Sequence, residues 1–204
     1  MALRIGITGN IGAGKTTVCR EFERLGVPIY YADARAKALM NSDPELREGI
    51  VTHFGPASYT SGGDLDRAYL AERAFADAGK LAILNRLVHP AVARDAAAWH
   101  ATQTTAYTLH EAAILLEIGA ADDYDSLVVV ACPYPTRQAR VLARDGITSA
   151  AFAERAEKQW PDARKEAAAD HLIHNDGRRL ILPQVLGLHR IFRESAAPNL
   201  PAGR

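Results

Sequence analysis

The stretch Gly9-Asn10-Ile11-Gly12-Ala13-Gly14-Lys15-Thr16 fits the pattern G-x-x-x-x-G-K-[ST] at every fixed position. The apolar character of residues 3–8 predicts a short buried strand immediately before this stretch. Val18, Phe22 and Leu25 recur at helical spacing after it and predict an amphipathic helix. A strand, a glycine-rich loop and a helix in this order are the arrangement that a phosphate-binding loop requires. We therefore predict that the chain binds a nucleoside triphosphate.

Each part of this loop has a physical role in holding phosphate. Glycine permits positive φ and has no side chain, so successive backbone N–H groups can turn toward one anion. The helix that follows adds its free N–H groups and the positive end of its dipole. Lys15 supplies a mobile charge for the β- and γ-phosphates, and Thr16 supplies a hydroxyl for Mg²⁺. The residues that we expect to bind ATP here are Gly12, Ala13, Gly14, Lys15, Thr16 and Thr17.

Composition limits the other classes of function. The 204 residues suffice for one sizeable core with inserted subdomains. The 24 basic and 24 acidic residues cancel, which argues against a nucleic-acid-coating protein. No stretch has the length and apolarity of a membrane span. Cys19 and Cys132 lack C-x-x-C or metal-ligand spacing, so we expect reduced thiols and a cytoplasmic location. The sequence leaves the oligomeric state open.

The remaining periodicity predicts an α/β core with helical insertions. Further strands are expected at 27–32, 107–115, 125–132 and 171–174. Between them, 43–103 is a helical insertion in which His89-Pro90 separates two helices and Phe75 faces inward. We divide the chain into a core (1–42, 104–134 and 169–194), this insertion, a lid (135–168) and a flexible tail (195–204).

Three polar residues are candidates for the acceptor side of a reaction. Asp33 directly follows the second expected strand, where a carboxylate can accept a proton from an attacking hydroxyl or hold a metal-bound water. Asp is also a good helix N-cap, and the sequence leaves both roles open. Arg67 and His89 are the polar residues of the insertion that we would test. A solvated arginine and a helix-capping histidine are the alternatives.

Further candidates follow the third and fourth expected strands. Glu111 interrupts an apolar run, so it either faces the reaction at the end of a strand or caps a helix. Arg137, Arg140 and Arg144 share one helix face, which favours closure over a phosphate, above all for Arg140, although a solvated basic stripe has the same spacing. Asn175 lies in a turn at the ligand edge of the sheet, where it can contact adenine.

Together these motifs resemble the dephospho-coenzyme A kinase family from about Leu3 to Phe192. The stretches that carry the resemblance are Ile5–Thr17, Tyr31–Asp33, Leu65–Arg67, His89–Pro90, Glu111–Glu117, Arg140–Asp145 and Ala169–Gly177. Two positions depart from the family pattern. Tyr31 replaces the first aspartate of Asp-Ala-Asp, so any metal or water role of that carboxylate is lost. Ala113 replaces the proline of the central motif.

The resemblance implies a fold and a reaction. The fold is a P-loop NTPase of three α/β/α layers, with a five-stranded parallel sheet. The reaction transfers phosphate from ATP, with Mg²⁺, to the ribose 3′-hydroxyl of dephospho-coenzyme A. The implied catalytic residues are Asp33, Lys15 and Arg140; Arg144 and Asn175 join the ATP site, and Arg67, His89 and Glu111 join Asp33 on the acceptor side. Another small-molecule kinase and a slowly hydrolysing nucleotide switch are the rival interpretations.

Overall fold

A computed structural model describes residues 2–197 of the chain. Its centre is a five-stranded sheet in the order β2-β3-β1-β4-β5. β1 pairs in parallel with β3 and β4, and β4 pairs in parallel with β5. The predicted α/β class with five strands is confirmed. The strands are β1 (Leu3–Thr8), β2 (Ile29–Tyr31), β3 (Tyr107–Glu111), β4 (Ser126–Ala131) and β5 (His171–His174).

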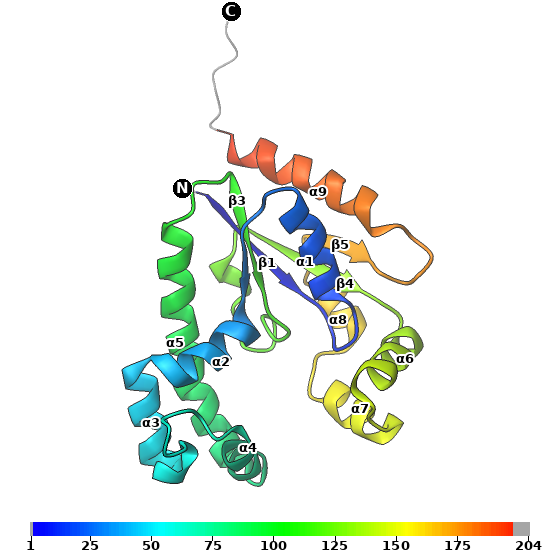
Figure 1. The fold of residues 1–204 in the computed structure, drawn as a ribbon. Helices are drawn as coiled ribbons and strands as arrows, with labels where there is room; N and C mark the ends of the chain where they lie inside the picture. The colour runs from blue at the N-terminus through cyan, green and yellow to red at the C-terminus, as the bar shows by residue number, and fades with distance from the viewer. Residues whose placement is uncertain (1, 198–204) are drawn as a thin grey trace, which may run out of the picture. The chain divides into compact units, whose positions relative to one another are not determined.

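The chain forms two compact units (Figure 1). Among the described residues, the first consists of 2–30 and 100–197, and the second is Tyr31–Trp99. The helices of the first unit are α1 (Lys15–Arg24), α6 (Tyr134–Asp145), α7 (Ser149–Glu157), α8 (Asp162–Ala167) and α9 (Ile181–Ala196), with a short 3-10 turn at Ala121–Asp123. The second unit contains α2 (Ala32–Ser42), α3 (Pro44–Phe54), α4 (Arg67–Phe75), most of α5 (Ala78–Ala101) and a 3-10 turn at Pro56–Ser58.

Side-chain alternation along β3 assigns its residues to the two sheet faces. Tyr107 packs edge-on against Phe22 of α1 and Phe192 of α9, with ring centroids 6.4 and 5.3 Å away. Because successive strand side chains point to opposite faces, Glu111 lies on the same face as Tyr107. His110 lies on the other face, where its Nδ1 is 3.0 Å from the Tyr124 hydroxyl. The end of β3 therefore directs Glu111 toward the face that carries α1.

The second unit has its own apolar core and its own helix caps. Asp43 accepts a hydrogen bond from the Leu46 N–H at the start of α3, and Asp66 accepts one from the Tyr69 N–H at the start of α4. Eight buried residues fill the core between these helices and α5: Leu39, Leu46, Ile50, Phe54, Leu65, Leu70, Ala74 and Ala91. This unit therefore packs around a small hydrophobic cluster that is separate from the sheet.

Several sequence expectations about the elements are wrong. His89-Pro90 does not separate two helices, because α5 runs through both; a proline removes one backbone hydrogen bond, and the other turns keep the helix intact. Phe75 is 69% exposed instead of facing inward, because Leu70 and Ala74, four residues apart, form the buried face of α4 and Phe75 lies off that face. The third strand ends at Glu111, well before residue 115. In the predicted tail, α9 extends to Ala196, and 198–204 lie outside the described residues.

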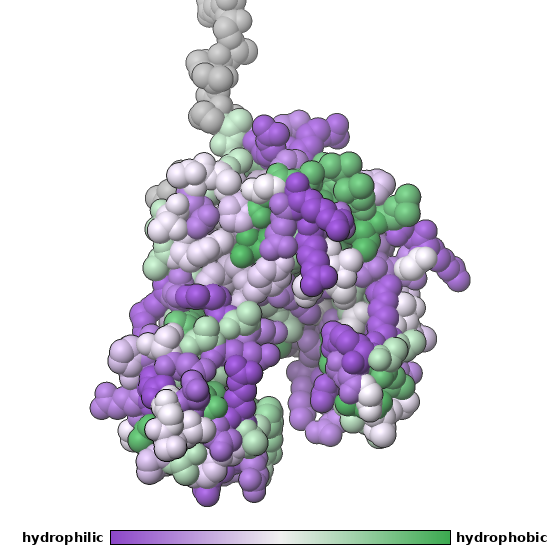
Figure 2. Space-filling view, in the orientation of Figure 1, coloured by the Kyte–Doolittle hydropathy of each residue, from purple (hydrophilic) through white to green (hydrophobic). Residues whose placement is uncertain are grey.

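Not every apolar helix face is covered by the core. Figure 2 shows an apolar patch on the part of the first unit where α9 lies. Leu182 and Leu186, one helical turn apart, are 48% and 47% exposed, and Leu180 just before the helix is also exposed.

Within the described part of the chain, no helix combines the length and apolarity that crossing a membrane requires.

Candidate active site

The glycine-rich loop has the conformation that its sequence predicts. Gly12 and Gly14 have φ of 80° and 86°, in the left-handed region that favours glycine. A Cβ atom at Gly12 would lie 2.6 Å from the Arg137 carbonyl oxygen, and one at Gly14 would collide with the Asn175 side-chain amide. Gly14 is the N-cap of α1, so the helix starts at Lys15 as soon as the loop ends. Both glycines are therefore required by backbone conformation and by close packing.

The Lys15 ammonium lies between the start of the loop and the end of β3. Its Nζ donates to the Gly9 carbonyl at 3.0 Å and is 3.9 Å from Oε1 of Glu111. Glu111 is 6% exposed, and a buried carboxylate needs an opposite charge of this kind. Glu111 is the last residue of β3, so its strand-end placement is confirmed and the helix-cap alternative is wrong. The arrangement brings a mobile cation to the loop and holds it there before any phosphate arrives.

The three arginines of α6 have three different environments. Arg137 is buried and binds Asp162, with Nη2 2.6 Å from Oδ2. Arg144 is exposed and pairs with its neighbour Asp145 at 2.7 Å, which raises the pKa of Arg144. Arg140, in contrast, forms no ion pair with a carboxylate of the described residues. The three arginines therefore share a helix face, as their spacing predicts, but their contacts differ.

Arg140 is held beside the loop by neutral acceptors. Its Nη1 donates to the Asn175 carbonyl at 3.0 Å and lies 3.3 Å from Sγ of Cys132. The side chain of Asn175 in turn donates to the Ala13 carbonyl at 2.7 Å, so Asn175 links the loop to Arg140. Because no carboxylate neutralises Arg140, its charge is available to an anion at the loop. Arg140 and Asn175 are thus close to the loop, whereas Arg144 has its contacts with Asp145.

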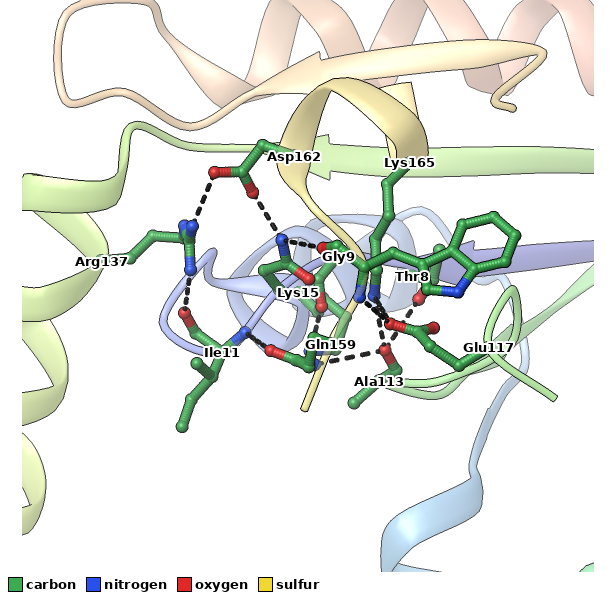
Figure 3. A network of polar contacts seen from close by, with 12 residues as sticks. Thr8, Gly9, Ile11, Lys15, Ala113, Glu117, Arg137, Gln159, Asp162 and Lys165 are labelled. Atoms are coloured by element: carbon green, nitrogen blue, oxygen red, sulfur yellow. Dashed lines mark hydrogen bonds and ion pairs between the residues drawn. The ribbon is translucent and has the colours of Figure 1, made fainter. Parts of the chain in front are cut away.

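The outer side of the loop is held by a segment more than 140 residues away in sequence (Figure 3). Oε1 of Gln159 accepts the Ile11 N–H at 2.7 Å. Nδ2 of Asn10 donates to Asp162 at 2.6 Å and to the Trp160 carbonyl at 3.1 Å. These contacts were not predicted, because side chains between two short helices give no periodic signal.

A buried ion pair anchors the same segment from the other direction. Nζ of Lys165 is 2.8 Å from Oε1 of Glu117 and donates to the Ala113 carbonyl at 3.0 Å. Thr8, directly before the loop, also donates to that carbonyl, at 3.2 Å. Burial lowers the pKa of Lys165, while the hydrogen bond to Glu117 raises it. Neither member of this pair was predicted as a contact, because the sequence of α8 is short and polar and gives no sign that Lys165 is buried.

Of the four predicted acceptor residues, Glu111 lies in the first unit at the end of β3, and the other three lie in the second unit. Asp33 is exposed in the first turn of α2, and the N-cap of that helix is Tyr31, so the N-cap alternative for Asp33 is wrong. Arg67 is exposed as the first residue of α4. His89 is half-buried within α5, which excludes the helix-capping alternative, and burial lowers its pKa.

The fold and the loop define the class of protein. A parallel sheet with the loop between β1 and α1 is the arrangement of a P-loop NTPase. A solved Campylobacter jejuni dephospho-CoA kinase shares this fold with a TM-score of 0.72 at 20% identity, and the match covers 97% of this chain and 100% of that chain. An Acinetobacter baumannii shikimate kinase matches with a TM-score of 0.51 at 15% identity, covering 96% of this chain and 95% of that chain. A Thermus thermophilus protein is nearer in sequence, with a TM-score of 0.82 at 30% identity over 93% of this chain and 97% of that chain.

The particular family follows from sequence comparison. A family model described as dephospho-CoA kinase matches residues 3–180. The dephospho-CoA kinase of Salinibacter ruber is 40% identical over 85% of this chain and 88% of its own length. That of Chlorobium luteolum is 39% identical over 95% of this chain and 92% of its own length. The chain belongs to the dephospho-CoA kinase family, and the predicted resemblance is confirmed.

Proposed function

We propose that the protein transfers the γ-phosphoryl group of ATP to the ribose 3′-hydroxyl of dephospho-coenzyme A. The products are coenzyme A and ADP, so the reaction is the last step of coenzyme A synthesis. The observation that carries this proposal is the complete phosphate loop with two cations beside it, in a chain of this family. Lys15 is held at the loop by Gly9 and Glu111, and Arg140 is held there by neutral acceptors.

On the phosphate side, the protein acts by position and charge. Backbone N–H groups from Gly12 to Thr17 bind the phosphates, and the start of α1 adds its dipole. Lys15 moves from the Gly9 carbonyl to the β- and γ-phosphate oxygens. Arg140 stabilises the negative charge on the transferring group. Asn175 holds Arg140 next to the loop. Arg144 pairs with Asp145, so it can contact ATP only if that pair breaks.

Magnesium fits the oxygen donor that the loop offers. Thr16 is exposed in the first turn of α1, and a hydroxyl oxygen is a ligand type that Mg²⁺ accepts. No cluster of three His, Cys, Asp or Glu side chains that could hold a metal occurs among the described residues. Thr16 would therefore hold a magnesium ion whose other ligands are phosphate oxygens and water. Bound in this way, Mg²⁺ supplies charge neutralisation for the triphosphate.

On the acceptor side, Asp33 is the proposed general base. Its carboxylate takes the proton of the ribose 3′-hydroxyl as the oxygen attacks the γ-phosphorus, and ADP leaves with the electrons of the broken P–O bond. Exposure in the first turn of α2 leaves Asp33 accessible to such a hydroxyl. Arg67 and His89 bind the acceptor, and Glu111 orients Lys15 between the two substrates. The reduced cysteines fit a cytoplasmic reaction.

The proposal is tested by measuring ADP release from Mg-ATP with and without dephospho-coenzyme A. We expect strong stimulation and a product that has gained one phosphate, detected by mass. An acceptor panel of nucleosides, nucleoside monophosphates and shikimate serves as the control. Faster turnover with one of these acceptors would contradict the substrate assignment. Slow hydrolysis with every acceptor would contradict a kinase and favour a nucleotide-dependent switch.

A further inference from the structure

The backbone N–H and carbonyl of Ile11, in the phosphate loop, are both held by side chains from outside the loop. Its N–H is accepted by Oε1 of Gln159 at 2.7 Å, and its carbonyl accepts Nη1 of Arg137 at 3.2 Å. Gly9 and Gly12 flank the pair Asn10-Ile11, so without side-chain contacts this part of the loop has wide conformational freedom. The contact with Gln159 removes that freedom from outside the loop, without occupying any N–H group from Gly12 to Thr17 that would bind phosphate.

We propose that Gln159 is a positioning residue for the phosphate loop. It holds the Ile11 peptide so that the N–H groups from Gly12 onward are aimed at the phosphates before the nucleotide binds. A binding site that is ordered in advance pays less conformational entropy when its ligand arrives. Gln159 touches Ile11 and is a residue of the α7–α8 connection, so nucleotide affinity depends on a segment outside the loop motif.

The geometry allows this role to be separated from general stability. The segment that carries Gln159 is also docked by Asp162, through Arg137, and by Lys165, through Glu117. The second polar group of Gln159, Nε2, makes only a long contact of 3.5 Å with the Ala113 carbonyl. Replacing the Gln159 amide therefore removes the bond to Ile11 while the segment stays anchored.

The test compares Gln159→Met with Lys158→Met in the full-length protein. Methionine matches the length of glutamine and lacks its strong acceptor, and Lys158 is an exposed neighbour that pairs with Glu154. The measurements are the Kd of ADP and of ATP by calorimetry, KM for each substrate, kcat and Tm. We expect Gln159→Met to raise Kd and KM for the nucleotide about fivefold, the equivalent of one net hydrogen bond. KM for the acceptor at saturating ATP and kcat should change less than about twofold.

Two results would overturn the proposal. One is an unchanged ADP affinity in Gln159→Met. The other is a similar rise in KM for the nucleotide and for the acceptor together with a large fall in Tm, which would indicate a loss of overall stability. Lys158→Met should match the wild type in Kd, KM and kcat and lie close to it in Tm, and a similar loss of affinity there would also count against Gln159. The kinetic measurements rest on the proposed kinase reaction, but the Kd of ADP does not. If Gln159→Met binds ADP more weakly than the wild type, and neither protein phosphorylates dephospho-coenzyme A, the result would support this inference and contradict the proposed function.

Discussion

The buried pair Lys165–Glu117 allows a quantitative prediction about folding stability. The Lys165 side chain is 1% exposed and that of Glu117 is 13% exposed, with 2.8 Å between Nζ and Oε1. In Lys165→Met, the Glu117 carboxylate stays buried without its cation, and breaking such a pair costs about 3–5 kcal/mol. The Trp160 N–H still donates to Glu117 at 2.9 Å, so we expect the lower end, about 3 kcal/mol.

The assay is urea unfolding followed by tryptophan fluorescence, since Trp160 adjoins the pair through its backbone N–H, which donates to Glu117. Lys158→Met is the matched control, because Lys158 and Glu154 form an exposed pair at 61% and 70% exposure that should contribute only about 0.3–0.5 kcal/mol. Adding Glu117→Gln to Lys165→Met removes the stranded charge and should recover about 2 kcal/mol in a double-mutant cycle. Equal losses in the two lysine variants, or no recovery in the double variant, would refute the reasoning.

Three further predictions concern the reaction, the loop and pH. Asp33→Asn should lower kcat by at least ~10²-fold in the ADP-release assay, the scale of a general base, and near-normal turnover would remove Asp33 from that role. Gly12→Ala should abolish measurable ADP binding in calorimetry, because its Cβ would meet a backbone oxygen at 2.6 Å, whereas Gly146→Ala at φ 65° in open space should bind normally. Burial lowers the pKa of His110 from 6.5 to about 4, so the unfolded state binds more protons between these values. Unfolding free energy should therefore fall by about 3 kcal/mol as pH falls through this window, and less in His110→Gln; equal slopes would contradict the assignment.

The parts of the site that were predicted from sequence are those whose signal is local. The loop, its strand and its helix are continuous in the chain, and glycine, lysine and threonine each have a distinct physical role there. Glu111 was found because a carboxylate in an apolar strand needs a partner, and the structure supplies Lys15 at 3.9 Å. The expected break at His89-Pro90 failed because a helix can absorb one missing hydrogen bond when its other turns are intact.

The parts that were not predicted depend on contacts between distant residues. Arg137 and Arg140 are three positions apart on one helix, and sequence spacing gives no reason to separate them. Their difference comes from Asp162, which lies 25 residues beyond Arg137 and neutralises that arginine alone. Likewise, Lys165 in a short charged helix has the pattern of a solvated residue. Its burial and pairing depend on distant residues, because α8 packs against β4 and Nζ of Lys165 meets Glu117 and the Ala113 carbonyl.

The phosphate loop thus has two sides that are specified in different ways. The motif specifies the inner side, because the N–H groups that we propose to bind phosphate belong to consecutive residues from Gly12 onward. The outer side, at Asn10 and Ile11, is specified by Gln159, Arg137 and Asp162. Since these partners touch the loop through its backbone and through one amide side chain, substitutions among them can change nucleotide affinity while the motif stays intact. Two chains with the same loop sequence can therefore differ in affinity for ATP for reasons that lie in the α7–α8 connection.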